Sequence, residues 1–184
     1  MTGVPFGVYK CERGYSVLGV NLVFAGFALT LNGFSYFVQV DDRVKALVNL
    51  LVGAVIAVNA VFQTALSTNH VGFGFAAATW MFAINYFIIA AHIFWGSKNW
   101  KIFGLYSLFA CIISFTFAGD TLLGGGPAVM VYLWLMWAIL WLQSFVALLL
   151  GIKSVDKLSP YVLITNGIAS TFVPGLLILL GVIL

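Results

Sequence analysis

Charged residues are scarce in this sequence. Of its 184 residues only 7% are Asp, Glu, Lys or Arg, whereas 63% are hydrophobic. Soluble domains carry about a quarter charged residues, because their surfaces must face water. A chain with so few charges cannot cover a water-exposed surface, and its mean hydropathy of +1.12 agrees with this. The composition therefore predicts an integral membrane protein.

Residues that bind metals or carry out acid–base chemistry are also few. The two cysteines are Cys11 and Cys111, and the two histidines are His70 and His92. None of them has a partner at metal-ligand or redox spacing, and no pair of carboxylates is placed for catalysis. The triple glycine Gly124–Gly126 lacks the following Lys-Ser/Thr of a phosphate-binding loop. We therefore expect no enzyme activity, catalytic residue, metal, cofactor or nucleic-acid partner.

Six long apolar runs are separated by charges and turn residues. A helix needs about 20 apolar residues to cross about 30 Å of hydrocarbon, and an isolated strand would leave its backbone unsatisfied in lipid. The expected spans are residues 15–38, 46–67, 72–95, 102–118, 127–150 and 161–184. Because short loops join them, we predict an all-α membrane protein, a six-helix bundle of three successive helical hairpins. Residues 1–14 form an N-terminal outer tail, and residues 15–184 form one transmembrane domain.

The basic residues gather in alternate loops. The first, third and fifth loops carry most of them, namely Arg43, Lys45, Lys98, Lys101, Lys153 and Lys157. The second and fourth loops carry none, while Lys10 and Arg13 lie in the N-terminal tail. Because basic loops stay in the cytoplasm, the sequence predicts that both termini lie outside.

The predicted spans themselves contain no Asp, Glu, Lys or Arg. Ion-coupled transporters rely on charged residues within the membrane, and ion channels rely on rings of charge or filters of backbone carbonyls. Neither feature is present in the spans. The sequence therefore favours a passive facilitator for a neutral solute.

Aromatic residues form two sets at helical spacing. In the fifth span, offsets of three and four place Trp134, Trp137 and Trp141 on one helix face. In the third span, Phe82 and Tyr86 are one turn apart. Lipid-facing tryptophans favour the two ends of a span, whereas these run through it, and spacing alone leaves both orientations open. If both sets faced a pore, flat neutral amides would fit between parallel aromatic walls, while the cost of desolvation would exclude ions.

Several fragments of the chain, in their order and spacing, resemble the urea/amide channel family. These fragments are Asn32-Gly33, Val40-Asp41, Asn49–Gly53, Phe82-x-x-x-Tyr86, Tyr106–Phe109, Trp134-x-x-Trp137-x-x-x-Trp141-Leu142, Pro160, Asn166-Gly167 and Pro174. The resemblance covers nearly the whole chain from Val17 onward. It implies six helices with both termini outside, in the bacterial cytoplasmic (inner) membrane. It also implies a homo-hexamer in which each protomer has its own pore.

The resemblance further implies which residues line the pore. The implied set is Trp134, Trp137, Trp141, Phe82, Tyr86, Leu22, Ala25, Leu29 and Asn166. Asn166 stands where acid-gated members of the family have a glutamate, so a polar contact is kept without its charge. The histidine-rich and acid-rich outer loops of those members have no counterpart here, and we therefore expect no acid gate.

The sequence thus predicts a passive channel for urea or short aliphatic amides. A first alternative is a monocarboxylate facilitator for solutes such as acetate, although no basic residue lies within the spans to attract an anion. A second alternative is a membrane subunit that does not transport and is held by the helices of a partner protein.

Overall fold

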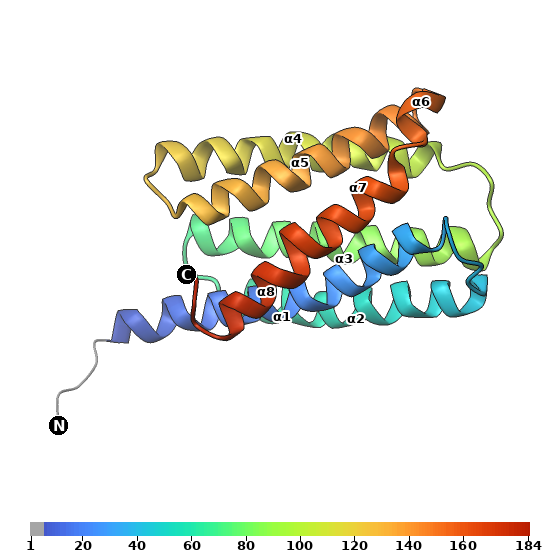
Figure 1. Ribbon diagram of the computed structural model, residues 1–184. Coiled ribbons are helices and arrows are strands. Elements are labelled where there is room, and N and C mark those ends of the chain that lie inside the picture. Colours follow the sequence, from blue (N-terminus) through green and yellow to red (C-terminus); the bar gives the residue numbers. More distant parts are fainter. Residues whose placement is uncertain (1–5) are drawn as a thin grey trace.

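The computed structural model describes the backbone from residue 6 and the side chains from residue 16, in both cases to residue 184. The chain folds into helices that run side by side along one axis (Figure 1). Their bounds are α1 Phe6–Phe34, α2 Asp42–Leu66, α3 His70–Phe94, α4 Lys101–Leu123, α5 Ala128–Leu148, α6 Lys153–Asp156, α7 Ser159–Thr165, the π-helical segment η1 Asn166–Phe172 and α8 Val173–Leu179. The last three segments follow one another without a break and form a single long helix.

Six helical stretches of the described chain are long and apolar enough to cross a membrane. They are 19 to 25 residues long, with mean hydropathies of 1.6 to 2.1. Leu, Phe, Ile and Val side chains cover much of the outer surface of the bundle, as a lipid environment requires. This confirms the predicted all-α membrane fold with six spans.

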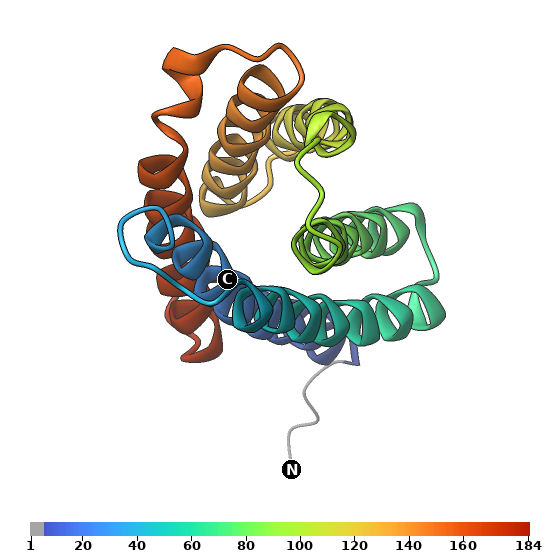
Figure 2. The ribbon, with the colours of Figure 1, turned by 90° about the vertical axis from the view of Figure 1, so that its right-hand side faces the viewer.

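The six spans stand in a ring when the bundle is viewed along its axis (Figure 2). Around the ring the order is α1, α2, α3, α4, α5 and the helix formed by α7, η1 and α8. If successive helices formed hairpins starting from the N-terminus, α1 would pair with α2. The most extensive contacts instead join α2 with α3, α4 with α5, and α1 with the last helix. The first and last helices therefore close the ring.

Glycine makes the contact between α1 and the last helix very close. A Cβ atom on Gly26 would lie 2.6 Å from the carbonyl oxygen of Gly167 and 2.6 Å from the backbone nitrogen of Phe172. Small residues allow this approach of backbones in membrane helices. The π-helical geometry of η1 lies just before Pro174, which has no N–H to donate to the preceding turn. The tight crossing fixes α1, which carries three of the predicted pore residues.

Two predicted helix ends differ from the structure, and in both cases the helix ends shortly before a glycine with a positive φ. The fourth span continues past the predicted end at residue 118 to Leu123, through Gly119. It ends where Gly125 adopts a φ of +69° and the Gly126 N–H donates to the Thr121 carbonyl at 2.8 Å. This is the usual way for a glycine to end a helix.

The last span ends at Leu179 rather than at residue 184 for the same reason. Gly181 has a φ of +67°, and the Val182 N–H donates to the Leu177 carbonyl at 2.9 Å. The first span ends at Phe34, before the predicted residue 38, and its helix already begins at Phe6. The predicted tail over residues 1–14 is therefore helical from residue 6, and its first five residues lie outside the described part.

The longer helices bring a few charges into their end turns. Asp42, Arg43 and Lys45 lie in the first turn of α2, Lys101 begins α4, and Asp120 lies in the last turn of α4. The predicted spans excluded these residues. Within the described residues, the middle of each span remains free of Asp, Glu, Lys and Arg.

Candidate functional site

A cluster of aromatic side chains lies inside the ring of helices. Trp134, Trp137 and Trp141 on α5 are only 3%, 1% and 1% exposed, so they face the interior and not the lipid. Phe82 and Tyr86 on α3 are also buried. The structure therefore decides between the two orientations that the spacing left open. We call these five residues the aromatic layer.

The rings of the aromatic layer meet mostly edge to face. The Phe82 and Trp137 ring centroids are 4.8 Å apart at 77°, and those of Trp134 and Trp137 are 5.0 Å apart at 88°. Phe82 also lies 6.0 Å from Trp141 at 48°. Edge-to-face contacts are favoured because the positive ring edge meets the negative ring face. The expectation of parallel aromatic walls is therefore wrong for these pairs.

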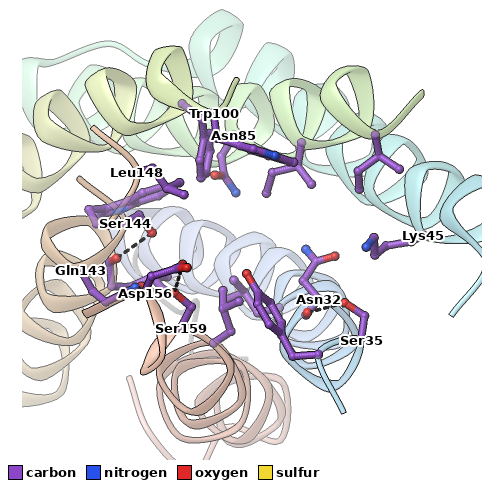
Figure 3. A pocket seen from close by; sticks show the side chains of 18 residues that line it. Asn32, Ser35, Lys45, Asn85, Trp100, Gln143, Ser144, Leu148, Asp156 and Ser159 are labelled. Carbon is purple, nitrogen blue, oxygen red and sulfur yellow. Dashed lines mark hydrogen bonds between the residues drawn. The ribbon is translucent and has the colours of Figure 1, made fainter. Parts of the chain in front are cut away.

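A cavity lies on each side of the aromatic layer. The larger cavity, of about 430 Å³, includes Leu29 and Trp141 in its wall and reaches Lys45 and Asp156 at the end of the bundle that carries the basic loops (Figure 3). The smaller cavity, of about 30 Å³, lies on the other side. Its lining includes Leu22, Ala25, Phe82, Trp134 and Trp137. Seven of the nine predicted pore residues thus line one cavity or the other.

The other two predicted pore residues, Tyr86 and Asn166, line neither cavity. The Tyr86 hydroxyl donates to the Ala25 carbonyl at 2.9 Å and so ties α3 to α1. The Asn166 amide nitrogen donates to the Val162 carbonyl at 3.1 Å, and its side-chain oxygen accepts from the Ser170 hydroxyl at 3.0 Å. The Asn166 amide is thus occupied within its own helix, and the geometry does not support a contact with a solute.

Three polar atoms beside the cavities lack a partner. Among the described residues, the buried side-chain atoms without a hydrogen bond are Asn85 Oδ1, Ser114 Oγ, Trp137 Nε1 and Trp141 Nε1. Trp137 lines the smaller cavity, and Trp141 and Asn85 line the larger one. Leaving such an atom unpaired costs about 1–3 kcal/mol. Three residues that line the cavities thus each carry a buried polar atom without a hydrogen-bond partner in the protein, two of them N–H donors and one a carbonyl acceptor.

Other polar groups in the wall of the larger cavity already have partners. Asn32 and Asn49 exchange two amide hydrogen bonds of 2.9 Å, and Asn49 also donates to the Lys45 carbonyl. The Gln143 side-chain nitrogen donates to the Ser159 hydroxyl at 2.6 Å. Such bonds between helices are the usual role of amide side chains in a membrane. Asn85 differs from these residues, and spacing in the sequence could not single it out.

Charge is confined to the mouth of the larger cavity. Lys45 and Asp156 border the mouth, and Lys45 forms an ion pair of 3.2 Å with Asp42. No charged side chain belongs to the aromatic layer, and the described residues contain no group of three or more His, Cys, Asp or Glu that could hold a metal ion. The aromatic layer itself thus offers an ion no compensating charge.

Comparison with known proteins identifies the family. The model of a protein family described as "AmiS/UreI family transporter" matches residues 17–182 of this chain. The chain is 26% identical over 191 residues to the acid-activated urea channel of Helicobacter pylori, covering 88% of this chain and 97% of that one. It is 25% identical over 166 residues to a Mycolicibacterium smegmatis protein named for the transport of amidate substrates, covering 89% of this chain and 76% of that one.

The fold agrees with this relationship. The crystal structure of the urea channel from Helicobacter pylori matches with a TM-score of 0.75 at 25% identity, over 91% of this chain and 99% of that one. The cryo-EM structure of the closed channel matches with a TM-score of 0.74. Because the family consists of transporters, the chain is an integral membrane transport protein and not an enzyme. The chain belongs to the AmiS/UreI family of urea and amide transporters.

Proposed function

We propose that the chain is a passive channel for urea and short aliphatic amides. The observation that carries this proposal is a set of buried, unpartnered groups beside an aromatic layer that has no charged side chain. These groups are the indole N–H groups of Trp137 and Trp141 and the carbonyl oxygen of Asn85. An amide carbonyl accepts from an indole N–H, and an amide NH₂ group donates to a carbonyl oxygen. These contacts replace the water that a neutral amide loses on entering, whereas an ion would lose far more.

The passive character is argued from the position of the charges. In the described part of the chain, the charged residues of the spans lie in end turns, as Asp120 does in α4. Ion-driven transporters need titratable or ion-binding groups within the membrane. This chain offers none in the middle of its described spans, so we propose that solute moves only down its own gradient.

The proposed setting is the bacterial cytoplasmic (inner) membrane. The basic loops would face the cytoplasm, which places the larger cavity on the cytoplasmic side and both termini outside. The homo-hexamer implied by the family resemblance is part of the same proposal. The apolar outer faces of the helices suit either lipid or a neighbouring protomer.

Two other functions are less well supported. A monocarboxylate facilitator would need groups that attract an anion, but the aromatic layer has no basic residue, and Lys45 at the mouth of the larger cavity is paired with Asp42. A membrane subunit without transport activity would have no use for two internal cavities lined by residues with unpartnered hydrogen-bonding groups. We therefore favour the amide channel.

Solute flux into liposomes that contain the purified protein tests the proposal. Stopped-flow light scattering at neutral pH should show urea and acetamide entering faster than in empty liposomes, while acetate enters no faster. Flux of acetate without flux of amides would favour the monocarboxylate facilitator. No flux of any solute would favour the non-transporting subunit.

The same liposomes test the absence of an acid gate. His70 is exposed at the end of the bundle opposite the basic loops, and it lines neither cavity. Urea flux should therefore be the same within about twofold at outside pH values of about 7.5 and 5. Flux that appears only at the acidic value would contradict this and point to His70 as part of a gate.

A further inference from the structure

We infer that the side-chain nitrogens of Asn21 and Asn85 are two solute-binding donors, one on each side of the aromatic layer. Each donates a hydrogen bond to the carbonyl oxygen of the solute, so that this oxygen has a partner as the solute enters the layer and as it leaves. The inference rests on the proposed amide channel and names the residues that recognise the carbonyl end of its solutes.

The buried amide side chains of the described chain fall into two groups. They belong to Asn21, Asn32, Asn49, Asn85, Gln143 and Asn166. In four of them the side-chain nitrogen donates to another group of the protein. Among the described residues, the nitrogens of the other two, Asn21 and Asn85, donate to no group. Amide side chains that hold membrane helices together use their donors on neighbours, so these two nitrogens are available to another partner.

Asn21 places its nitrogen beside the smaller cavity. It lies on α1, is 6% exposed, and lines that cavity together with Phe82 and Trp134 of the aromatic layer. Its oxygen accepts from the Asn59 side-chain nitrogen at 2.6 Å, which fixes the oxygen toward α2. Its nitrogen is not among the buried atoms that lack a partner, so it retains accessible surface. Because the side chain lines the smaller cavity, we place this donor in the wall of that cavity.

Asn85 places its nitrogen beside the larger cavity. It lies on α3, is 3% exposed, and lines that cavity together with Trp141 of the aromatic layer. Figure 3 shows its amide group projecting from α3 into the cavity. Its oxygen is one of the buried atoms without a partner, whereas its nitrogen is not. The accessible end of Asn85 is therefore a donor.

Two such donors suit a solute with a carbonyl oxygen. The oxygen of an amide has two lone pairs and accepts hydrogen bonds from N–H groups, and both urea and acetamide carry one. Guanidinium is a flat cation of about the size of urea, but it has only N–H donors and would meet the N–H groups of the two asparagines. Sites built to hydrogen-bond a polar group of the substrate reject analogues that lack it. The pair thus favours neutral carbonyl compounds over their cationic analogues.

The first test removes each donor at nearly constant side-chain size. In liposomes, N21L and N85L should each lower urea and acetamide flux about fivefold, because the solute loses one hydrogen bond. The matched controls are T79V for the smaller cavity and S144A for the larger one. Both residues line a cavity, but their hydroxyl groups already donate to backbone carbonyls of their own helices. The two control variants should leave amide flux unchanged.

The second test distinguishes contact with the solute from a structural role. N21D and N85D keep the shape of each side chain and exchange its nitrogen for an oxygen. N21D also keeps the oxygen that accepts from Asn59. Each variant offers a carboxylate to a cation in the pathway, so millimolar guanidinium should block urea flux through both variants and leave the wild type unaffected. A residue that acted only through packing would not create a site for this cation when it is exchanged.

The outcomes separate the inference from the proposed function. If the wild type carries no urea, the channel itself is wrong and the inference falls with it. If the wild type carries urea and either leucine variant carries it equally fast, the channel stands and the pair of donors is wrong. The same holds if the leucine variants are slow but guanidinium fails to block either aspartate variant, because that residue then acts through packing. Slow flux in both leucine variants together with block of both aspartate variants supports the inference.

Discussion

Replacing Trp137 by alanine is expected to admit solutes larger than urea and to destabilise the protein. The Trp137 indole packs edge to face against Phe82 and Trp134 and forms part of the wall of the smaller cavity. Its removal would leave a void beside the smaller cavity, and we propose that this void widens the solute pathway. Glycerol, which should not enter through the wild type, should then enter liposomes that contain W137A.

The stability of W137A should fall as well. Truncating a fully buried tryptophan to alanine costs about 3–5 kcal/mol, from lost burial and the void that remains. Thermal unfolding in detergent should show a clearly lower melting temperature. W95A is the matched control, because Trp95 is 78% exposed at the end of α3 and lies outside the aromatic layer. If W137A excludes glycerol as strictly as the wild type does, Trp137 does not form the constriction.

Replacing Gly26 by alanine is expected to disrupt the contact that closes the ring of helices. The added Cβ would meet the backbone of Gly167 and Phe172 at 2.6 Å, and backbone atoms in packed helices cannot move aside as the end of a flexible side chain can. Overpacking of this kind costs about 3 kcal/mol. Because α1 also carries Leu22, Ala25 and Leu29, a shifted α1 would displace one wall of both cavities.

A second glycine provides the control for this variant. A Cβ on Gly119 would have no atom within 4 Å, and Gly119 lies inside α4. G119A should be neutral or stabilise the protein by about 0.5–1 kcal/mol, because alanine loses less backbone freedom on folding. Melting of G26A at the wild-type temperature would contradict the close packing of α1 against η1.

The gross fold follows from the sequence, because lipid leaves a chain few choices. Six apolar runs of sufficient length predict six helices, since any other structure would leave backbone groups unsatisfied in the bilayer. The offsets between Trp134, Trp137 and Trp141 likewise fix a shared helix face. Both predictions depend only on local geometry, and the structure confirms both.

The details of the site depend on how each helix is rotated about its axis and packed against its neighbours. Residue spacing within one helix does not determine this packing. Asn85 and Asn166 are both asparagines within apolar spans, but only Asn85 lines a cavity with its acceptor free. The Asn166 amide is taken up by neighbours in the last helix, where the π-helical segment begins. Similarly, the spacing of aromatic residues along a helix does not show whether the rings of Phe82 and Trp137 pack edge to face or lie parallel to each other.

The central claim is that a neutral amide crosses the aromatic layer by accepting hydrogen bonds from the indole N–H groups of Trp137 and Trp141. The most direct test is urea flux through the double variant W137F/W141F, which keeps an aromatic ring at each position and removes both donors. Measured beside the wild type by stopped-flow light scattering, the variant should carry urea at least about tenfold more slowly. Its water permeability should remain at the wild-type value. Urea flux equal to that of the wild type would contradict the account.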